Sequence, residues 1–209
     1  KTDNPPQGLI SNKNICYLGT KIWGSGFLFE ETAQDGSSSI EDMHRLINEN
    51  PSNKEVIFSY IGGEEFNTAV DQRPSRFVID FGEISLSEAQ KWPSLLKIVD
   101  ERVRPVRAHN KQRNYRENWW IHANRVREAA PFLRTYGRLL ALAEVSKHLA
   151  VGFIESGTVI ANTMVLFLLW EDHDFGVLQS RIHEVWARFL GSSLTDRLRY
   201  ITPCFDTFP

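Results

Sequence analysis

The sequence predicts an α+β fold with a mixed or antiparallel sheet and flanking helices. Three observations lead to this class. Short β-like runs occur along the whole chain, apolar residues recur at helical spacing between them, and no internal repeat, low-complexity tract or flexible linker interrupts the pattern. The 209 residues are enough to bury a core, and 42% hydrophobic with 24% charged residues is an ordinary globular composition.

The first part of the chain alternates strand and helix signals. Two β-like runs, ICYLGTKI and GFLFE, lie within residues 15–30. Ser39 is a predicted N-cap of a helix that Asn50-Pro51 ends. Strands are predicted over 55–60 and 76–81. The Gly62-Gly63 pair between them is interpreted as a turn, because two glycines alone do not make a phosphate cradle.

The later elements follow from the same signals. Ser85 or Ser87 caps a helical stretch that Trp92-Pro93 interrupts and that continues toward Pro105. Further strands are predicted over 138–142, 149–154 and 163–170. A strong amphipathic helix is predicted over 175–190, because six apolar residues recur there at helical spacing: Val177, Leu178, Ile182, Val185, Trp186 and Phe189.

The charge is concentrated in the middle of the chain. Residues 101–149 hold eleven Lys/Arg against four acids, a local charge of +7, although the whole chain carries −2. The stretch RAHNKQRNYRENWW is the densest part, and its side chains are those that contact phosphates and base edges. A local basic field favours an anionic partner, although a solvated charged surface has the same composition.

Several other candidate sites are interpreted as structural. Trp119-Trp120 is expected to pack in the core rather than stack on a base. His183 is expected to be a hydrogen-bonded structural residue. The acidic run at 171–174 is expected to cap a helix through Asp172 or Asp174 rather than bind a metal. Asp80 and Glu83 lack the later acid-x-Lys of a restriction-nuclease pattern, so no metal site is predicted.

The remaining signals concern compartment and cofactors. Cys16 and Cys204 form no CxxC motif, so no structural zinc is predicted, and two reduced thiols in a cytoplasmic protein are favoured over a disulfide between the ends of the chain. No signal peptide is found. The apolar run at 164–170 is too short to span a bilayer and is predicted to be a buried strand, so no membrane partner is expected.

Asn4-Pro5-Pro6 resembles part of the catalytic loop of adenine-N6 DNA methyltransferases. In that loop an aromatic residue follows the second proline and stacks on the flipped-out adenine. Gln7 occupies this position here and cannot stack, and only three residues precede Asn4. No glycine-rich S-adenosylmethionine site follows a predicted strand. No catalytic residue is therefore predicted in this chain.

Six segments occur in an order that is similar to a known family. They are RFVIDFG at 76–82, VRPVR at 103–107, Trp119-Trp120, VSKH at 145–148, FGVLQSRIHEVW at 175–186 and YITPCFDTFP at 200–209. They resemble the target recognition domain that follows the methyltransferase domain in MmeI-like (type IIL) restriction–modification proteins and related adenine-N6 DNA methyltransferases. The resemblance is firmest over 75–209. It implies one recognition domain over 1–209, with a possible subdivision near 100–105.

The resemblance implies a fold like that of a target recognition domain, in a bacterial and cytoplasmic protein. The chain would be excised from a longer polypeptide and would recognise a specific sequence in double-stranded DNA. The methyltransferase domain of the same polypeptide would bind S-adenosylmethionine and methylate the adenine that this module positions. No cofactor is implied for this segment itself. Base-reading side chains in the family come from the middle and later loops, which correspond here to 110–118 and to the surroundings of Ser146, Lys147 and His148.

Two sets of site residues follow as hypotheses. The candidates for phosphate binding are Arg104, Arg107, Lys111, Arg113, Arg116, Arg125 and Arg127. The candidates for base reading are Asn110, Gln112, Asn114, Lys147 and His148. Two other functions stay open, namely a standalone RNA- or protein-binding module and a metal-dependent nuclease built on Asp80 and Glu83.

Overall fold

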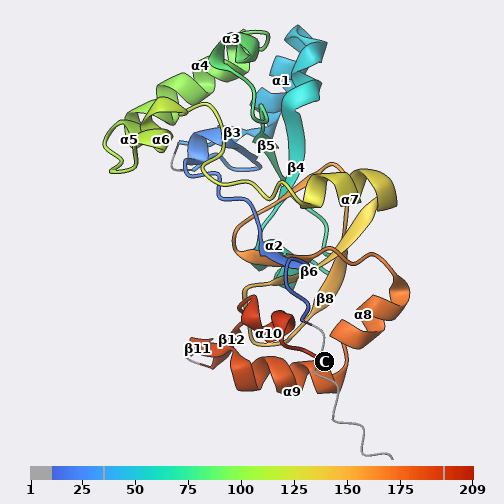
Figure 1. Ribbon diagram of the computed structural model, residues 1–209. Coiled ribbons are helices and arrows are strands. Elements are labelled where there is room, and N and C mark those ends of the chain that lie inside the picture. The colour runs from blue at the N-terminus through green and yellow to red at the C-terminus, as the bar shows by residue number, and fades with distance from the viewer. Residues whose placement is uncertain (1–10, 35, 195) are drawn as a thin grey trace, which may run out of the picture.

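The computed structural model describes residues 11–34, 36–194 and 196–209. They form an elongated molecule with an upper and a lower lobe (Figure 1). The upper lobe contains a five-stranded mixed sheet, and the lower lobe contains a four-stranded and a three-stranded antiparallel sheet. The predicted α+β class is confirmed. Asn4-Pro5-Pro6 and Gln7 lie outside the described residues.

The upper lobe is a sheet covered by short helices. Its strands are β2 (Leu28–Glu30), β3 (Ser38–Ser39), β4 (Ile57–Ile61), β5 (Arg76–Ile79) and β9 (Thr158–Ile160), in the order β3-β2-β5-β4-β9. Its helices are η1 (Ser25–Phe27), α1 (Ile40–Glu49), η2 (Pro51–Val56), α3 (Leu86–Ala89), α4 (Pro93–Arg102), α5 (Arg104–Ala108) and α6 (Arg113–Glu117). The predicted caps are confirmed at Ser39 and Ser85, whose Oγ atoms accept from backbone N–H groups of the first helical turn.

The lower lobe is built around the sheet β1-β10-β6-β8. Its strands are β1 (Cys16–Leu18), β6 (Arg138–Ala143), β8 (Val151–Glu155) and β10 (Met164–Phe167). Alternate residues of these strands supply two different hydrophobic clusters, as expected for a sheet buried on both faces. On one face lie α8 (Asp172–Leu178), α9 (Arg181–Leu190) and α10 (Pro203–Asp206), and on the other lie α2 (Gly63–Thr68) and α7 (Ala129–Tyr136). The predicted buried strand at 164–170 is confirmed over its first part, because β10 ends at Phe167.

A third sheet continues from the end of β6. After Glu144 the chain forms β7 (Val145–Ser146), which pairs with β12 (Arg197–Arg199), and β12 pairs with β11 (Ser192–Leu194). The backbone N–H of Tyr200 donates to the carbonyl oxygen of Glu144 at 2.7 Å, which fixes this small sheet to the edge of the lower lobe. The loop 147–150 therefore leaves this sheet beside Arg197, at the end opposite to Ser192.

The single helix predicted over 175–190 is wrong. The structure divides it into α8 and α9, because Gln179 turns inward and its side-chain amide bonds the backbone of Leu149 and Val151 at 3.0 and 2.9 Å. Ser180 then caps α9 by accepting from the N–H of His183 at 3.2 Å. The acidic run caps α8, but the N-cap is Glu171 rather than the predicted Asp172 or Asp174, and Asp174 accepts from the N–H of Glu171 at 3.3 Å.

The two lobes share strands across the sequence. β9, from the second half of the chain, pairs in parallel with β4 of the upper lobe, and β1, from the start, pairs with β10 of the lower lobe.

The possible subdivision near 100–105 falls between α4 and α5, where Val103 is fully buried in the upper core. Cys16 and Cys204 are both buried as free thiols in the lower core. Within the described residues, the helices are all too short or too polar to cross a membrane.

Candidate nucleic-acid interface

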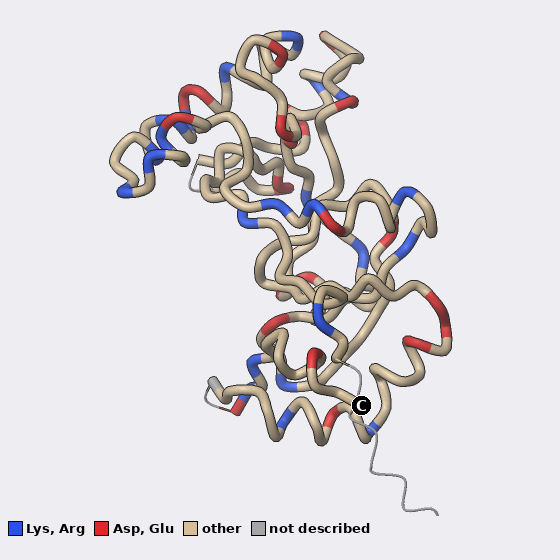
Figure 2. Tube along the Cα trace, in the orientation of Figure 1, with Lys and Arg blue, Asp and Glu red and all other residues tan. Residues whose placement is uncertain are grey.

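The predicted contact residues lie on two separate surfaces. The first, the α5–α6 surface, comprises residues 104–118 at the tip of the upper lobe. The second, the β7 surface, comprises residues 146–148 together with β11 and β12 in the lower lobe. Both project to the left in Figure 1, and Figure 2 shows Lys and Arg gathered along the tip that carries α5 and α6. The basic region of the sequence is thus divided between the lobes.

Arg107 does not fit the role of a phosphate contact. Its side chain is fully buried, whereas a phosphate-binding guanidinium must be accessible. It donates to four backbone carbonyl oxygens, those of Ile22, Trp23, Asn118 and Ile121, at distances of 2.5 to 3.2 Å. Burial lowers the pKa of Arg107 to about 10. Arg107 is therefore a structural residue that joins α5 to the loop before η1 and the loop after α6.

The other arginines of the α5–α6 surface are exposed. Arg104 pairs with Asp100 at 3.0 Å and Arg113 pairs with Glu117 at 2.7 Å, both as i,i+4 pairs on a helix surface. Arg116 donates to the carbonyl oxygens of Asn110 and Lys111 at 2.5 and 3.1 Å. Exposed pairs of this kind contribute little to stability, so a phosphate can compete for these groups.

The polar residues of the same surface differ in how far their side chains are already used. Asn110 accepts the N–H of Gln112 at 2.8 Å, and Asn114 accepts from the amide of Asn118 at 2.5 Å. These bonds shape the loop between α5 and α6. Within the described residues, the exposed side chains of Lys111 and Gln112 have no recorded hydrogen-bond or ion-pair partner, which leaves them available to a ligand at the tip of the loop.

Trp119 and Trp120 pack in the upper core beneath the α5–α6 surface. Both belong to the upper core, and their rings meet edge to face with centroids 5.9 Å apart. The indole N–H of Trp120 donates to the carbonyl oxygen of Ile84 at 2.9 Å. Arg104 lies over the ring of Trp119, 5.4 Å from its centroid. The expectation that the tryptophan pair packs in the core is confirmed.

Arg125 and Arg127 lie away from both surfaces and face acids. The guanidinium of Arg125 bonds the carboxylate of Asp80, whose side chain is almost fully buried and also accepts the N–H of Gly82. The more exposed Arg127 bonds Glu83 at 2.5 Å. Arg125 is needed to balance a buried charge, so its role as a phosphate contact is not favoured. Arg127 keeps an exposed position from which a phosphate can be reached.

The same pairs bear on the nuclease alternative. Asp80 and Glu83 each face an arginine, and the described residues contain no group of three or more His, Cys, Asp or Glu side chains that could hold a metal ion. His122 lies near Asp80, with Nδ1 3.7 Å from Oδ1, but its Nε2 bonds the carbonyl oxygen of Ile79 in the buried core. Burial lowers the pKa of His122.

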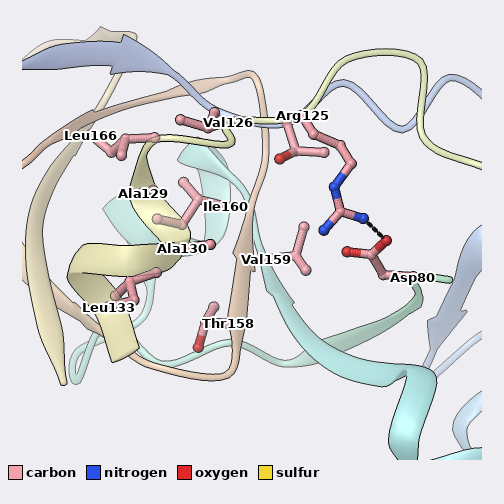
Figure 3. Close-up of a pocket in the computed structure, with 11 residues that line it drawn as sticks. Asp80, Arg125, Val126, Ala129, Ala130, Leu133, Thr158, Val159, Ile160 and Leu166 are labelled. Atoms are coloured by element: carbon pink, nitrogen blue, oxygen red, sulfur yellow. Dashed lines mark hydrogen bonds and ion pairs between the residues drawn. The ribbon is translucent and has the colours of Figure 1, made fainter. Parts of the chain in front are cut away.

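A small pocket adjoins the Asp80–Arg125 pair. Figure 3 shows the pair at one edge, with Val159 and Ile160 of β9 and Ala129 and Leu133 of α7 along the rest of the wall. The two charged groups of its lining bind each other, and most of the remaining lining is apolar. The arrangement offers no free charge to a phosphate, so the pocket is not part of the candidate interface.

The β7 surface brings together residues that are distant in the sequence. Lys147 and His148 are exposed in the loop after β7, where Ser146 accepts the N–H of His148 at 3.1 Å. Arg188 of α9 donates to the carbonyl oxygen of Lys147 at 3.1 Å. β12 lies next to β7 and carries Arg197 and Arg199.

Arg188, Arg197 and Arg199 were missed by sequence reasoning. Arg199 pairs with Glu144 at 2.9 Å, and Arg197 is exposed. The sequence did contain a signal for β12, because Arg197-Leu198-Arg199 has the alternation of a strand with Leu198 buried and both arginines outward.

His183 is structural as expected, with Nε2 2.9 Å from the hydroxyl of Tyr200.

Comparisons with known proteins place this chain in a family. A search of curated proteins gave no match. A solved structure of the type IIL restriction–modification enzyme MmeI in complex with DNA has a similar fold, with a TM-score of 0.74 and 22% sequence identity. The match covers 100% of this chain and 26% of that one, so this chain spans about a quarter of its length. The model of the family described as "MmeI, target recognition domain" matches residues 31–209, and the chain belongs to this family.

Proposed function

We propose that this chain recognises a specific DNA sequence as the target recognition domain of a type IIL restriction–modification enzyme. Family membership over residues 31–209 is the observation that carries the proposal. The enzyme with the similar fold was solved in complex with DNA, which supports double-stranded DNA as the partner. Two exposed surfaces with basic and amide side chains supply the groups that such a partner requires.

In the finer form of the proposal, the chain positions a target adenine for methylation at N6. The methyltransferase domain belongs to the same polypeptide and binds S-adenosylmethionine, and the whole protein acts in the bacterial cytoplasm. No catalytic step and no cofactor is assigned to the residues of this chain. The chain binds the duplex and has a higher affinity for the target sequence than for other sequences.

The two surfaces divide this work. Exposed cations on the α5–α6 surface are proposed to contact phosphates, with Arg104, Lys111, Arg113 and Arg116 as the candidates. Gln112 at the tip of that loop, beside Asn110 and Asn114, is placed to reach a base edge. On the β7 surface, Lys147 and His148 are the proposed readers, and exposed Arg197 on the adjoining strand extends the set. Arg and Lys suit guanine, whereas Asn and Gln suit adenine.

A salt titration with surface-specific variants tests the proposal. Binding to a mixed-sequence duplex is measured by fluorescence anisotropy across a salt series. The Lys111→Glu/Arg113→Glu and Lys147→Glu/Arg197→Glu variants each reverse two charges on one surface. Lys54→Glu/Arg73→Glu is the matched control, because both residues are exposed and belong to neither of the two surfaces. Each of the first two variants should weaken binding and reduce its salt dependence, and the control should change both much less.

Two results would favour other functions. Equal weakening by all three variants would mean that net charge alone governs binding, which argues against a defined interface. Tighter binding to single-stranded or double-stranded RNA of the same sequence than to DNA would favour an RNA-binding module instead.

A further inference from the structure

The outer face of α9 carries an apolar stripe that this chain does not cover. Ile182, Val185, Trp186 and Phe189 follow the i, i+3, i+4, i+7 spacing of one helix face. Ile182 is 72% exposed, Val185 56% and Phe189 82%, and together with Trp186 and Arg181 they line a shallow apolar groove. Single exposed apolar residues are common on protein surfaces, but a contiguous stripe of this kind marks a contact surface.

The inner face of α9 shows why the stripe cannot simply turn inward. Ala187 and His183 are fully buried against the lower core, where His183 bonds both the carbonyl oxygen of Leu178 and the hydroxyl of Tyr200. Ile182, Val185 and Phe189 face outward, whereas Trp186 packs in part against the lower core and only borders the stripe. Rotating the helix would break both histidine bonds, so the stripe needs a partner from outside.

Both ends of the described chain meet beside this helix. The N–H of Asn12 donates to the carbonyl oxygen of Asp206 at 3.0 Å, and its side-chain amide donates to that of Phe208 at 2.8 Å. The ring of Phe208 contacts His183 and Trp186 of α9, with centroids 4.9 and 6.4 Å apart. Figure 1 shows the C-terminus next to α9. A domain joined to the C-terminal end of this chain is therefore tethered close to the stripe.

The charges around the stripe point to a protein partner rather than to nucleic acid. Glu184 binds Arg181 at 2.7 Å and Arg188 at 2.9 Å, so the charged groups on this helix are largely neutralised by one another. An apolar centre with a paired, polar border is the composition of a protein–protein interface. A duplex offers phosphates and sugars, which gain nothing from Phe189 or Ile182.

We propose that the apolar face of α9 is covered by a neighbouring domain of the same polypeptide, the one joined to this chain after Phe208. The inference rests on the proposed function only in taking this chain as part of a longer protein, in line with its match to 26% of the MmeI chain. Because α9 runs directly into β11 and Arg188 holds the loop of Lys147, a domain seated on α9 also holds the β7 surface in place.

Thiol labelling tests this contact directly. Phe189→Cys places a reactive group in the stripe, and Val70→Cys is the control because Val70 is fully exposed and lies outside α9. Each variant is made in the 209-residue chain and in the full-length polypeptide, and both native cysteines are buried. Modification of Phe189→Cys by a maleimide should be at least about tenfold slower in the full-length protein, whereas Val70→Cys should react at similar rates in both.

Three outcomes would overturn the proposal. Equal rates for Phe189→Cys in the two proteins would leave the stripe uncovered. Protection that already exists in the 209-residue chain and disappears on dilution would assign the face to a second copy. Protection that appears only when a DNA duplex is added would assign it to the nucleic acid. The labelling does not depend on DNA binding by this chain, so failure of the proposed function and failure of this inference are distinguishable.

Discussion

The Nη1 atom of Arg107 lies 2.7 Å from the carbonyl oxygen of Ile121, and the two residues join α5 to the loop that follows α6. An arginine in the most basic part of the sequence thus serves the interior of the protein. This relationship separates stability from binding on the α5–α6 surface, because one arginine there is structural while its neighbours are exposed.

Replacing Arg107 with Met should destabilise the fold strongly. Four carbonyl oxygens would lose their donor, and each buried group left without a partner costs about 1–3 kcal/mol. We expect the free energy of unfolding to fall by at least about 3 kcal/mol, measured by urea denaturation. Unchanged stability together with weaker DNA binding would return Arg107 to the set of phosphate contacts.

Replacing Arg113 with Gln should weaken DNA binding without destabilising the fold. The pair of Arg113 with Glu117 is exposed and contributes little, so the free energy of unfolding should stay nearly unchanged. The slope of log K against log salt should fall by about 1, with all sequences weakened alike. Arg45→Gln is the control, since Arg45 forms a similar exposed i,i+4 pair with Glu49 on α1. The same loss of slope in Arg45→Gln would argue against a specific phosphate contact.

Substitutions on the β7 surface should change which sequence is preferred. Lys147→Ala, made in the full-length polypeptide, should relax the preference at one base pair, with a loss of about 1–3 kcal/mol for the original base. The readout is competition between duplexes that differ at single positions of the proposed target site. Uniform weakening of every duplex would make Lys147 a phosphate contact instead.

The buried histidines should make the fold less stable in mild acid. Burial lowers the pKa values of His122 and His183 below the ordinary value of 6.5. Below pH 6.5 the histidines of the unfolded chain are therefore protonated, while those of the folded chain stay neutral. The free energy of unfolding falls as the pH drops from 6.5 toward the lowered pKa values of the folded state. The loss approaches at most about 1.4 kcal/mol per pH unit for each histidine.

Urea midpoints at pH 7.5 and 5.5 measure this effect. His183→Gln keeps a group that can bond Leu178 and Tyr200 without titrating, so its midpoint should fall less over this interval than that of the original protein. An identical fall in both proteins would show that His183 does not contribute to the pH dependence.

Asp80→Asn separates a structural carboxylate from a catalytic one. The substitution removes the charge that Arg125 balances, so we expect a loss of stability of about 1–3 kcal/mol. DNA incubated with magnesium should stay intact with either the original chain or the variant. Cleavage by the original chain that is lost in the Asp80→Asn variant would establish the nuclease alternative.

Local signals in the sequence predicted the longer strands and the helices α1, α3 and α4, but not the short helices α2, α5, α6 and α7. Ser39 and Ser85 cap helices as predicted, because an N-cap depends only on residues within the first turn. The break between α8 and α9 was not predictable in this way. It depends on Gln179 reaching the backbone of Leu149 and Val151, some thirty residues away in the sequence. The outward direction of the α9 stripe was also hidden, since periodicity reveals an apolar face but not what covers it.

The candidate site shows the same limit. Composition identified the basic region, but it could not distinguish buried Arg107 from exposed Arg113, because that difference arises from the approach of residues 22–23. It also could not join Lys147 to Arg197, which are neighbours only through the pairing of β7 with β12. The contacts proposed for individual site residues stay predictions.

The exchange of strands between the lobes has a practical consequence for dividing the protein. A cut at the fully exposed Val70 would leave β4 in one fragment and its sheet partners β5 and β9 in the other, while β1 would be separated from β10. Neither the five-stranded nor the four-stranded sheet would be complete in either fragment. The chain is therefore suited to a split reporter. Each fragment alone should not bind DNA, and the proposed DNA binding should return only when another interaction brings the two fragments together.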